Sequence, residues 1–276
     1  MRRIPDNICE KIIKDYEAGQ TMKEVGEKYG VSHAFISKMF KRRGVQARSR
    51  SEAIRRYPAD DNFFNEINTQ DKAYILGMLY GDGCNMSYYD RGVHQVRLQL
   101  KYDDREILEK VRDAIGTFRP IKECMSNTGF GVLHSAILDI TNKQQCIDLC
   151  RHGVVPQKTN ILTYPKTLDD NLLFHFLRGL SDSDGCIHDP IRRKYRADLY
   201  GTESLMLAIQ KKLDECGIMS RIRRGHSGAG FKPAEILCIS GKENFYKYLD
   251  NLYCDANLKM ERKYRRYLGF LDLKAG

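Results

Sequence analysis

The chain has 276 residues, 42% of them hydrophobic, which is enough for one large folded domain or two to three small ones. Its formal net charge of +10 favours a polyanionic partner, and residues 1–57 alone carry 14 Lys and Arg against 7 Asp and Glu. There is no membrane-length apolar stretch, no signal peptide and no metal-type spacing among the nine cysteines, so we expect an intracellular protein with reduced thiols.

Three short helices are predicted near the N-terminus, at residues 8–18, 22–29 and 33–43. Thr21 is placed to cap the second helix, with Glu24 three residues later, which is the pattern of a capping box. A short helix, a glycine turn and a capped helix with a basic end form the outline of a helix-turn-helix. The arrangement resembles the helix-turn-helix of resolvases and transposases. The alternative is a three-helix bundle used only for packing.

In a helix-turn-helix, the start of the last helix enters the major groove and its basic end lies on the phosphates. The candidate base contacts are Ser32, His33, Ser37 and Lys38, and the candidate phosphate contacts are Lys41 and Arg42. The basic segment 46–56 that follows fits either a short helix or an extended arm along a groove. We place this DNA-binding domain and its linker at residues 1–57.

From about residue 63 the predicted elements occur twice in the same order: helix, two strands, helix, two strands, helix. The first copy has strands at 96–101, 118–123 and 133–140 and helices at 104–115 and 142–150. The second copy has strands at 195–199, 218–224 and 235–240 and helices at 203–216 and 242–252. We expect an α+β protein with two pseudo-symmetric αββαββα halves, at residues 58–165 and 166–276.

Each copy begins with the same short pattern. The first reads Ile75-Leu-Gly77-Met-Leu-Tyr-Gly81-Asp82-Gly83, and the second reads Leu177-Arg-Gly179-Leu-Ser-Asp-Ser183-Asp184-Gly185. Small residues four apart share one helix face, where two backbones can approach closely. The candidate helix-interface residues are therefore Gly77, Gly81, Gly179 and Ser183.

The aspartate at the end of each pattern is unfavourable by itself. A carboxylate at a helix C-terminus opposes the helix dipole, and two such carboxylates repel if the helices pair. A divalent cation between Asp82 and Asp184 removes both penalties, which predicts a metal site. The alternative is that each Asp-Gly is a hairpin turn.

The two patterns resemble those of the LAGLIDADG homing endonucleases, and the resemblance extends from about residue 70 to the end of the chain. Both copies keep the glycine, the final aspartate and the closing glycine. The family has an acid two places before the final aspartate, which Asp182 matches and Tyr80 replaces. The resemblance implies two sheets forming a saddle over DNA, with the motif helices paired at its centre.

The expected site combines metal ligands, supporting lysines and two DNA-reading surfaces. The metal, Mg²⁺ or Mn²⁺, is expected on Asp82 and Asp184, assisted by the backbone carbonyls of Gly81 and Ser183. The resemblance makes Lys143 and Lys242 the candidates for supporting catalysis. Lys158 and Lys259 also occupy equivalent places in the two copies, and contact with the DNA backbone is the alternative role for them. Outward strand positions predict DNA contacts from Arg97, Gln99, Lys101, Arg192, Lys194, Arg196, Arg221 and Arg223. A solvated sheet face would also be charged, which is the alternative for each of these residues.

These observations predict a monomeric, magnesium-dependent endonuclease that cuts both strands of a long, asymmetric DNA target. One alternative is a transcriptional regulator that binds DNA without cutting it, and the presence of both aspartates argues against it. The other is a maturase that assists splicing of an intron RNA, although a helix-turn-helix favours duplex DNA.

Overall fold

The computed structural model describes residues 4–18, 20–47, 60–129, 131–188, 195–225 and 234–275. The chain divides into two compact units, Met1–Pro58 and Ala59–Gly276. Within the described ranges, none of the helices combines the length and the apolar character needed to cross a bilayer.

In the smaller unit the described residues form three helices, α1 (Asp6–Glu17), α2 (Met22–Tyr29) and α3 (His33–Arg43). The predicted capping box is present: the Glu24 backbone N–H donates to Thr21 Oγ1, and the Thr21 N–H donates to the Glu24 carboxylate at 2.8 Å. The three helices meet around an apolar core formed by Cys9, Ile12, Tyr16, Val25, Ile36, Met39 and Phe40. This burial fixes the outward face of α3.

The larger unit contains two four-stranded antiparallel sheets with the same connectivity. The first has the order β1-β2-β4-β3 and the second β5-β6-β8-β7. The strands of the first sheet are β1 (Gly83–Asn85), β2 (Val96–Lys101), β3 (Lys122–Thr128) and β4 (Gly131–Ile140). Those of the second are β5 (Gly185–Ile187), β6 (Arg196–Gly201), β7 (Ser220–Arg224) and β8 (Glu235–Ser240). The predicted α+β class and the duplicated halves are confirmed.

Helices cover one face of each sheet. They are α5 (Gln70–Gly81), α6 (Arg105–Ile115), α7 (Lys143–Arg151), α8 (Leu173–Asp184), α9 (Glu203–Glu215), α10 (Lys242–Tyr253) and α11 (Glu261–Ala275). The alternation in β2 explains this layering, because Val96, Leu98 and Leu100 are buried while Arg97 and Gln99 lie on the other face. In the first sheet, that other face carries polar side chains.

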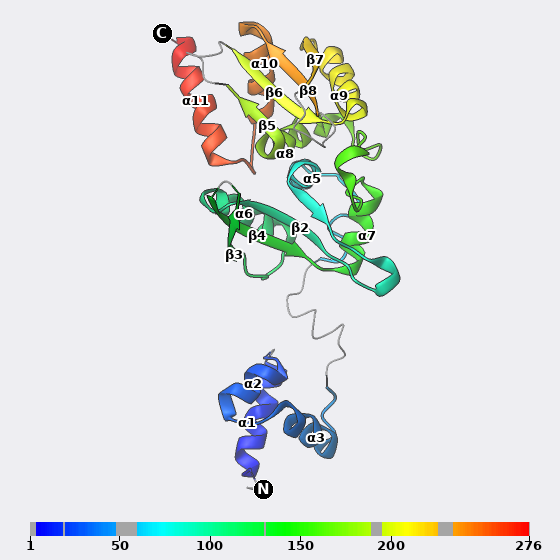
Figure 1. Ribbon diagram of the computed structural model, residues 1–276, viewed down its shortest axis with the longest axis vertical. Helices are drawn as coiled ribbons and strands as arrows, with labels where there is room; N and C mark the ends of the chain where they lie inside the picture. Colours follow the sequence, from blue (N-terminus) through cyan, green and yellow to red (C-terminus); the bar gives the residue numbers. More distant parts are fainter. Residues whose placement is uncertain are drawn as a thin grey trace. The chain divides into compact units, whose positions relative to one another are not determined.

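The two motif helices, α5 and α8, pack side by side between the two sheets (Figure 1). Their approach depends on glycine, because a Cβ on Gly77 would lie 2.1 Å from the Phe176 carbonyl oxygen. A Cβ on Gly179 would likewise lie 2.0 Å from the Tyr74 carbonyl oxygen. One continuous apolar core surrounds this helix pair and includes residues of both halves.

The largest differences from the predicted ranges concern β3 and α11, and the short strands β1 and β5 had no predicted range. β3 begins at Lys122 rather than at residue 118, because this edge strand is largely exposed and has no apolar alternation to locate it. α11 was not predicted as a separate helix. It is fixed through Phe270, whose ring lies 4.7 Å from that of Phe245 on α10 and whose carbonyl accepts from the Tyr246 hydroxyl.

We expect Gly77→Ala and Gly179→Ala each to lower the free energy of unfolding by about 1–3 kcal/mol, because the added methyl group overlaps the partner helix backbone. The measurement is urea unfolding followed by circular dichroism. Gly269→Ala is the control, since a Cβ at this exposed position in α11 meets nothing within 4 Å. Equal midpoints for all three variants would contradict the tight helix seam.

Candidate functional site

The C-terminal ends of α5 and α8 meet at Gly81 and Ser183. A Cβ on Gly81 would lie 2.1 Å from Ser183 Oγ and 3.1 Å from Asp184 Oδ2. Only glycine therefore fits at this position. The absence of a side chain allows the Asp184 carboxylate to lie directly against the end of the opposite motif helix.

The two motif aspartates form an electrostatically coupled pair. Burial, and then the charge of Asp184, raise the pKa of Asp82 to about 6. Burial is also the main cause of the raised pKa of Asp184. Both residues nevertheless keep surface exposed to solvent, so a ligand can reach them. A cation at this point would relieve the cost of holding two carboxylates together.

Two buried lysines that the sequence analysis did not select for the site lie at the ends of the motif helices. Lys158 Nζ donates to the carbonyl oxygens of Tyr80 at 2.7 Å and Gly81 at 2.9 Å. Lys263 Nζ donates to the carbonyls of Asp182 at 2.9 Å and Gly185 at 2.8 Å. These ammonium groups satisfy carbonyls that have no partner within the helix, and their charge complements the helix dipole.

The same two lysines act on the aspartates. Lys263, followed by Lys158, opposes the rise in the pKa of Asp82, and Lys158, followed by Lys263, does so for Asp184. In return, burial lowers the pKa of both lysines while the aspartate charges counteract that effect. The motif ends therefore form one network of two carboxylates and two ammonium groups.

The predicted supporting lysines lie elsewhere. Lys143 and Lys242 begin α7 and α10, and Lys242 Nζ lies 6.0 Å from the centre of the Tyr195 ring. Neither is among the charges that most affect the pKa of Asp82 or Asp184. Lys259, which spacing matched to Lys158, donates to the Ala256 carbonyl instead. The correct counterpart, Lys263, belongs to the helix that the sequence analysis missed.

Each aspartate lines a cavity that also includes the end of the opposite motif helix. Asp184 shares a cavity of about 580 Å³ with Gly81, Lys158 and Arg224. Asp82 shares one of about 400 Å³ with Ser183 and several further polar residues, namely Gln99, Lys101, Ser135 and Arg262. These two cavities are similar, and each lies between a motif aspartate and the sheet of the same half.

The residue two places before each motif aspartate has a structural role. Asp182 is buried and accepts from the Tyr74 hydroxyl at 2.7 Å and from the Met260 N–H at 2.8 Å. Tyr80, at the equivalent place, donates to the His152 carbonyl at 2.7 Å. Both side chains tie a motif helix to its surroundings, which explains why a tyrosine can replace the acid.

The donor set at the motif ends fits a hard, hydrated cation. Within the described ranges, His, Cys, Asp and Glu do not converge in groups of three or more that could enclose a metal. Two carboxylates are the number with which magnesium is commonly held, because it retains most of its waters. Of the two predicted carbonyl ligands, that of Gly81 already accepts from Lys158. The Ser183 hydroxyl donates to the Gly179 carbonyl at 3.0 Å.

The predicted DNA-reading residues of the first half line the open face of its sheet. Arg97 Nε donates to Asp139 Oδ1 at 2.8 Å, Gln99 donates to the Ser135 hydroxyl at 3.0 Å, and Lys101 is exposed. Burial opposes ionisation of Asp139, but hydrogen bonds from Arg97 and other donors outweigh it and hold its pKa at about 2. The Asp139 carboxylate is therefore a fixed negative charge beneath the polar face.

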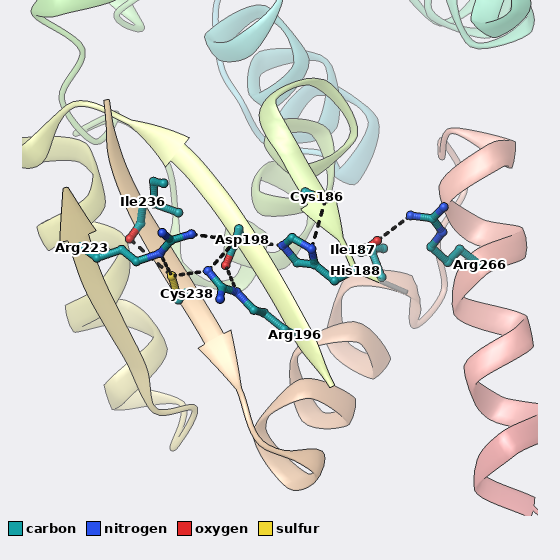
Figure 2. A network of polar contacts seen from close by, with 9 residues as sticks. All are labelled: Cys186, Ile187, His188, Arg196, Asp198, Arg223, Ile236, Cys238 and Arg266. Carbon is teal, nitrogen blue, oxygen red and sulfur yellow. Dashed lines mark hydrogen bonds and ion pairs between the residues drawn. The ribbon is translucent and has the colours of Figure 1, made fainter. Parts of the chain in front are cut away.

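The second half carries a similar network (Figure 2). Arg196 donates through Nε and Nη2 to the two oxygens of Asp198, both at 2.9 Å, and Arg223 Nε lies 3.0 Å from Cys238 Sγ. Arg221 is exposed. The other two predicted contacts, Arg192 and Lys194, lie outside the described residues.

The predicted DNA-contacting side of α3 is exposed in the smaller unit. This applies to Ser32, His33, Ser37, Lys38, Lys41 and Arg42. Ser32 also caps α3, since its hydroxyl accepts from the Phe35 N–H at 3.2 Å. The helix therefore presents polar and basic side chains along one free surface.

Comparison with known proteins relates the larger unit to one fold. Residues 171–253 match a family model described as a LAGLIDADG-like domain. The homing endonuclease I-WcaI bound to its DNA recognition sequence superposes with a TM-score of 0.52 at 13% identity, covering 77% of this chain and 91% of that one. The two proteins share this fold. A comparison with curated proteins gives no match.

Two further solved structures are similar at lower scores. The N-terminal LAGLIDADG domain of DUF199/WhiA has 16% identity and a TM-score of 0.46, covering 80% of this chain and 97% of that one. I-DmoI, in a variant bound to its target DNA in the presence of magnesium, has 14% identity and a TM-score of 0.44, covering 70% and 98%.

We expect Asp139→Asn to lower the free energy of unfolding at pH 7 by about 2 kcal/mol, because the native carboxylate has a depressed pKa. The stabilisation is complete above the ordinary pKa of an aspartate and is lost as pH falls through the folded value. The difference between native protein and variant should therefore shrink from about pH 5 to about pH 2.

The measurement for Asp139→Asn is urea unfolding across this pH range. Asp214→Asn, at an exposed position on α9, is the control for losing one negative charge. A stability difference that stays constant with pH would show that Asp139 does not act through its charge.

Proposed function

We propose that this protein is a site-specific endonuclease that hydrolyses both strands of a DNA duplex with a divalent cation, Mg²⁺ or Mn²⁺. The observation that carries the proposal is the convergence of Asp82 and Asp184, one from each half, at the ends of two helices packed backbone to backbone. An arrangement with this electrostatic cost is expected where a cation and a phosphate complete it. The fold shared with I-WcaI supports the proposal.

Duplex DNA would bind along the open faces of the two sheets. These faces carry Arg97, Gln99 and Lys101 in the first half and Arg196, Arg221 and Arg223 in the second. Arginine and lysine suit the guanine edge in the major groove, and glutamine suits adenine. The helix-turn-helix at residues 1–57 would add phosphate and base contacts through α3. One chain with two halves would act as a monomer on a target without twofold symmetry.

Hydrolysis of a phosphodiester requires that charge on the phosphoryl group be neutralised and that a water be activated, which a divalent cation supplies when bound. Asp82 and Asp184 would hold that cation, with the carbonyls of Gly81 and Ser183 close by. Lys158 and Lys263 would keep both carboxylates ionised, because their ammonium charges lower the pKa of each aspartate. Two cavities, one for each aspartate, correspond to two scissile phosphates.

One observation favours a second candidate, a DNA-binding regulator without catalysis. Lys158 and Lys263 already place two positive charges near the aspartates, so the pair can persist without a metal. The open sheet faces would bind DNA in the same way in such a protein. An intron RNA maturase is the third candidate. Cleavage is the measurement that separates the endonuclease from the other two.

We expect the intact protein to linearise a plasmid that carries its target when magnesium is present and to leave it intact when the metal is chelated. The target is the uninterrupted host locus, that is, the genomic site without the intron or insertion that would carry the gene for this protein. This site is cloned on the plasmid. Asp82→Asn and Asp184→Asn should abolish linearisation or reduce it to nicking, since each removes a metal ligand. DNA affinity should change by about fivefold or less, which corresponds to about 1 kcal/mol for one changed contact. Tight binding without cutting by all three proteins would favour the regulator.

We expect Lys158→Met and Lys263→Met to slow cleavage by about 100-fold, the scale for loss of one electrostatic donor at a reaction centre. Lys143→Met and Lys242→Met are the matched controls and should cleave at the native rate, because neither lysine is among the charges that most affect the pKa of the two aspartates. Single-turnover rates on the same plasmid give the comparison, and melting temperatures identify any variant that has unfolded. The reverse pattern would restore the sequence-based assignment.

A further inference from the structure

The open face of each sheet has a buried carboxylate at its centre, Asp139 in the first half and Asp198 in the second. Their side chains are 1% and 0% exposed. A base edge in the groove therefore cannot reach either carboxylate. The cations bound to them are accessible, since Arg97 is 30% exposed and Arg223 is 44% exposed.

Strand register shows that these two networks occupy the same place in the two halves. Gly83 pairs with Leu98 and Gly185 with Leu199, so Arg97 and Asp198 are equivalent positions. By the same reasoning, the partner across the ladder is Asp139 in the first half and Cys238 in the second. The carboxylate thus belongs to β4 in the first half and to β6 in the second, but it lies at the centre of the face in both.

The flanking donors are also equivalent. Gln95 and Arg196 each lie two residues before the central position, and each donates to the carboxylate, at 2.9 Å in both halves. Lys122 and Arg223 face equivalent isoleucines of β4 and β8, and each reaches the carboxylate from the edge strand, at 2.7 and 3.4 Å. A carboxylate anchor with donors on both sides is therefore common to both sheets.

All three arginines in these networks are held by the same edge. Arg97, Arg196 and Arg223 each use Nε and Nη2 for their contacts with the central carboxylate or the Cys238 thiol. Figure 2 shows Arg196 and Arg223 in this arrangement. A guanidinium has a second donor edge, Nη1 with Nη2, which suits the O6 and N7 atoms of guanine. Holding the first edge fixes the plane and direction of the second.

We propose that Asp139 and Asp198 are positioning residues that set base specificity, one for each half of the DNA target. This proposal rests on the proposed binding of duplex DNA and names what the two faces read. In the second half, Arg223 keeps its second edge available and reads one guanine, whereas Nη2 of Arg196 is engaged by both Asp198 and Cys238. The first half presents Arg97 with Gln95 and Lys122, and reads one guanine within a less restricted sequence.

The test begins with selection from a library of random DNA duplexes by the intact protein, without magnesium so that nothing is cut. Binding is then measured for the selected sequence, for single-base substitutions of it and for an unrelated duplex. Asp198→Asn should lower discrimination at the guanine of one half-site about tenfold or more and leave the other half-site unchanged. Asp139→Asn should do the opposite, so each variant is the control for the other.

Affinity for the unrelated duplex separates positioning from a merely structural role. Each substitution removes a negative charge from the DNA-facing side, so non-specific affinity should be equal to or higher than that of the intact protein. Asp214→Asn, with the same charge change on α9, should keep full discrimination. A uniform loss of affinity for all duplexes, without loss of discrimination, would overturn the proposal.

A rescue variant keeps the test decisive if Asp198→Asn does not fold. Asp198→Arg combined with Cys238→Asp gives the second sheet the arrangement of the first, with a carboxylate on β8 opposite an arginine on β6. It should fold and recover discrimination at that half-site, and recovery of binding without discrimination would overturn the proposal.

If the intact protein selects no sequence, the proposed function itself fails. Selection followed by unchanged discrimination in both aspartate variants refutes only the positioning role.

Discussion

The structure of the larger unit depends on the backbone-to-backbone packing of α5 against α8. Gly77 and Gly179 each lie where a methyl group would overlap a carbonyl of the other helix, so the two helices approach as closely as their main chains allow. This seam joins the apolar cores of the two halves and fixes the position of one sheet relative to the other. It also decides where Asp82 and Asp184 meet, because both follow the last turn of these helices.

The seam places like charges together, and the rest of the site compensates for them. A carboxylate beyond a helix C-terminus is opposed by the dipole, and burial raises the pKa of both aspartates. Lys158 and Lys263 reach the same helix ends from distant segments and donate to the carbonyls there. The pair of acids is therefore held in an ionisable and accessible state, which is suited to binding a cation and unsuited to simple packing.

The sequence predicted the elements with strong local signals and missed those defined by tertiary contacts. Helical and strand periodicity, Gly116 after α6 and the capping residues Thr21 and Ser32 located most elements within a few residues. β3 was displaced because an exposed edge strand carries no apolar pattern. Lys263 was missed because only the packing of α11 brings it to the end of α8, whereas spacing along the chain pointed to Lys259. The anchoring of arginines by Asp139 and Asp198 follows from strand register, which cannot be read from the sequence alone.

The helix seam has a further consequence for how the two halves relate to each other. Its closest backbone approaches are at glycines in equivalent places on the two helices, so at these points each motif helix presents a similar surface to the other. A surface of this kind is close to self-complementary, as isologous contacts require. A half released from the other would expose an apolar helix face that matches its own copy. The covalent link between the halves therefore favours pairing of the two different halves over pairing of two copies of the same half. It also permits the two sheets to diverge independently.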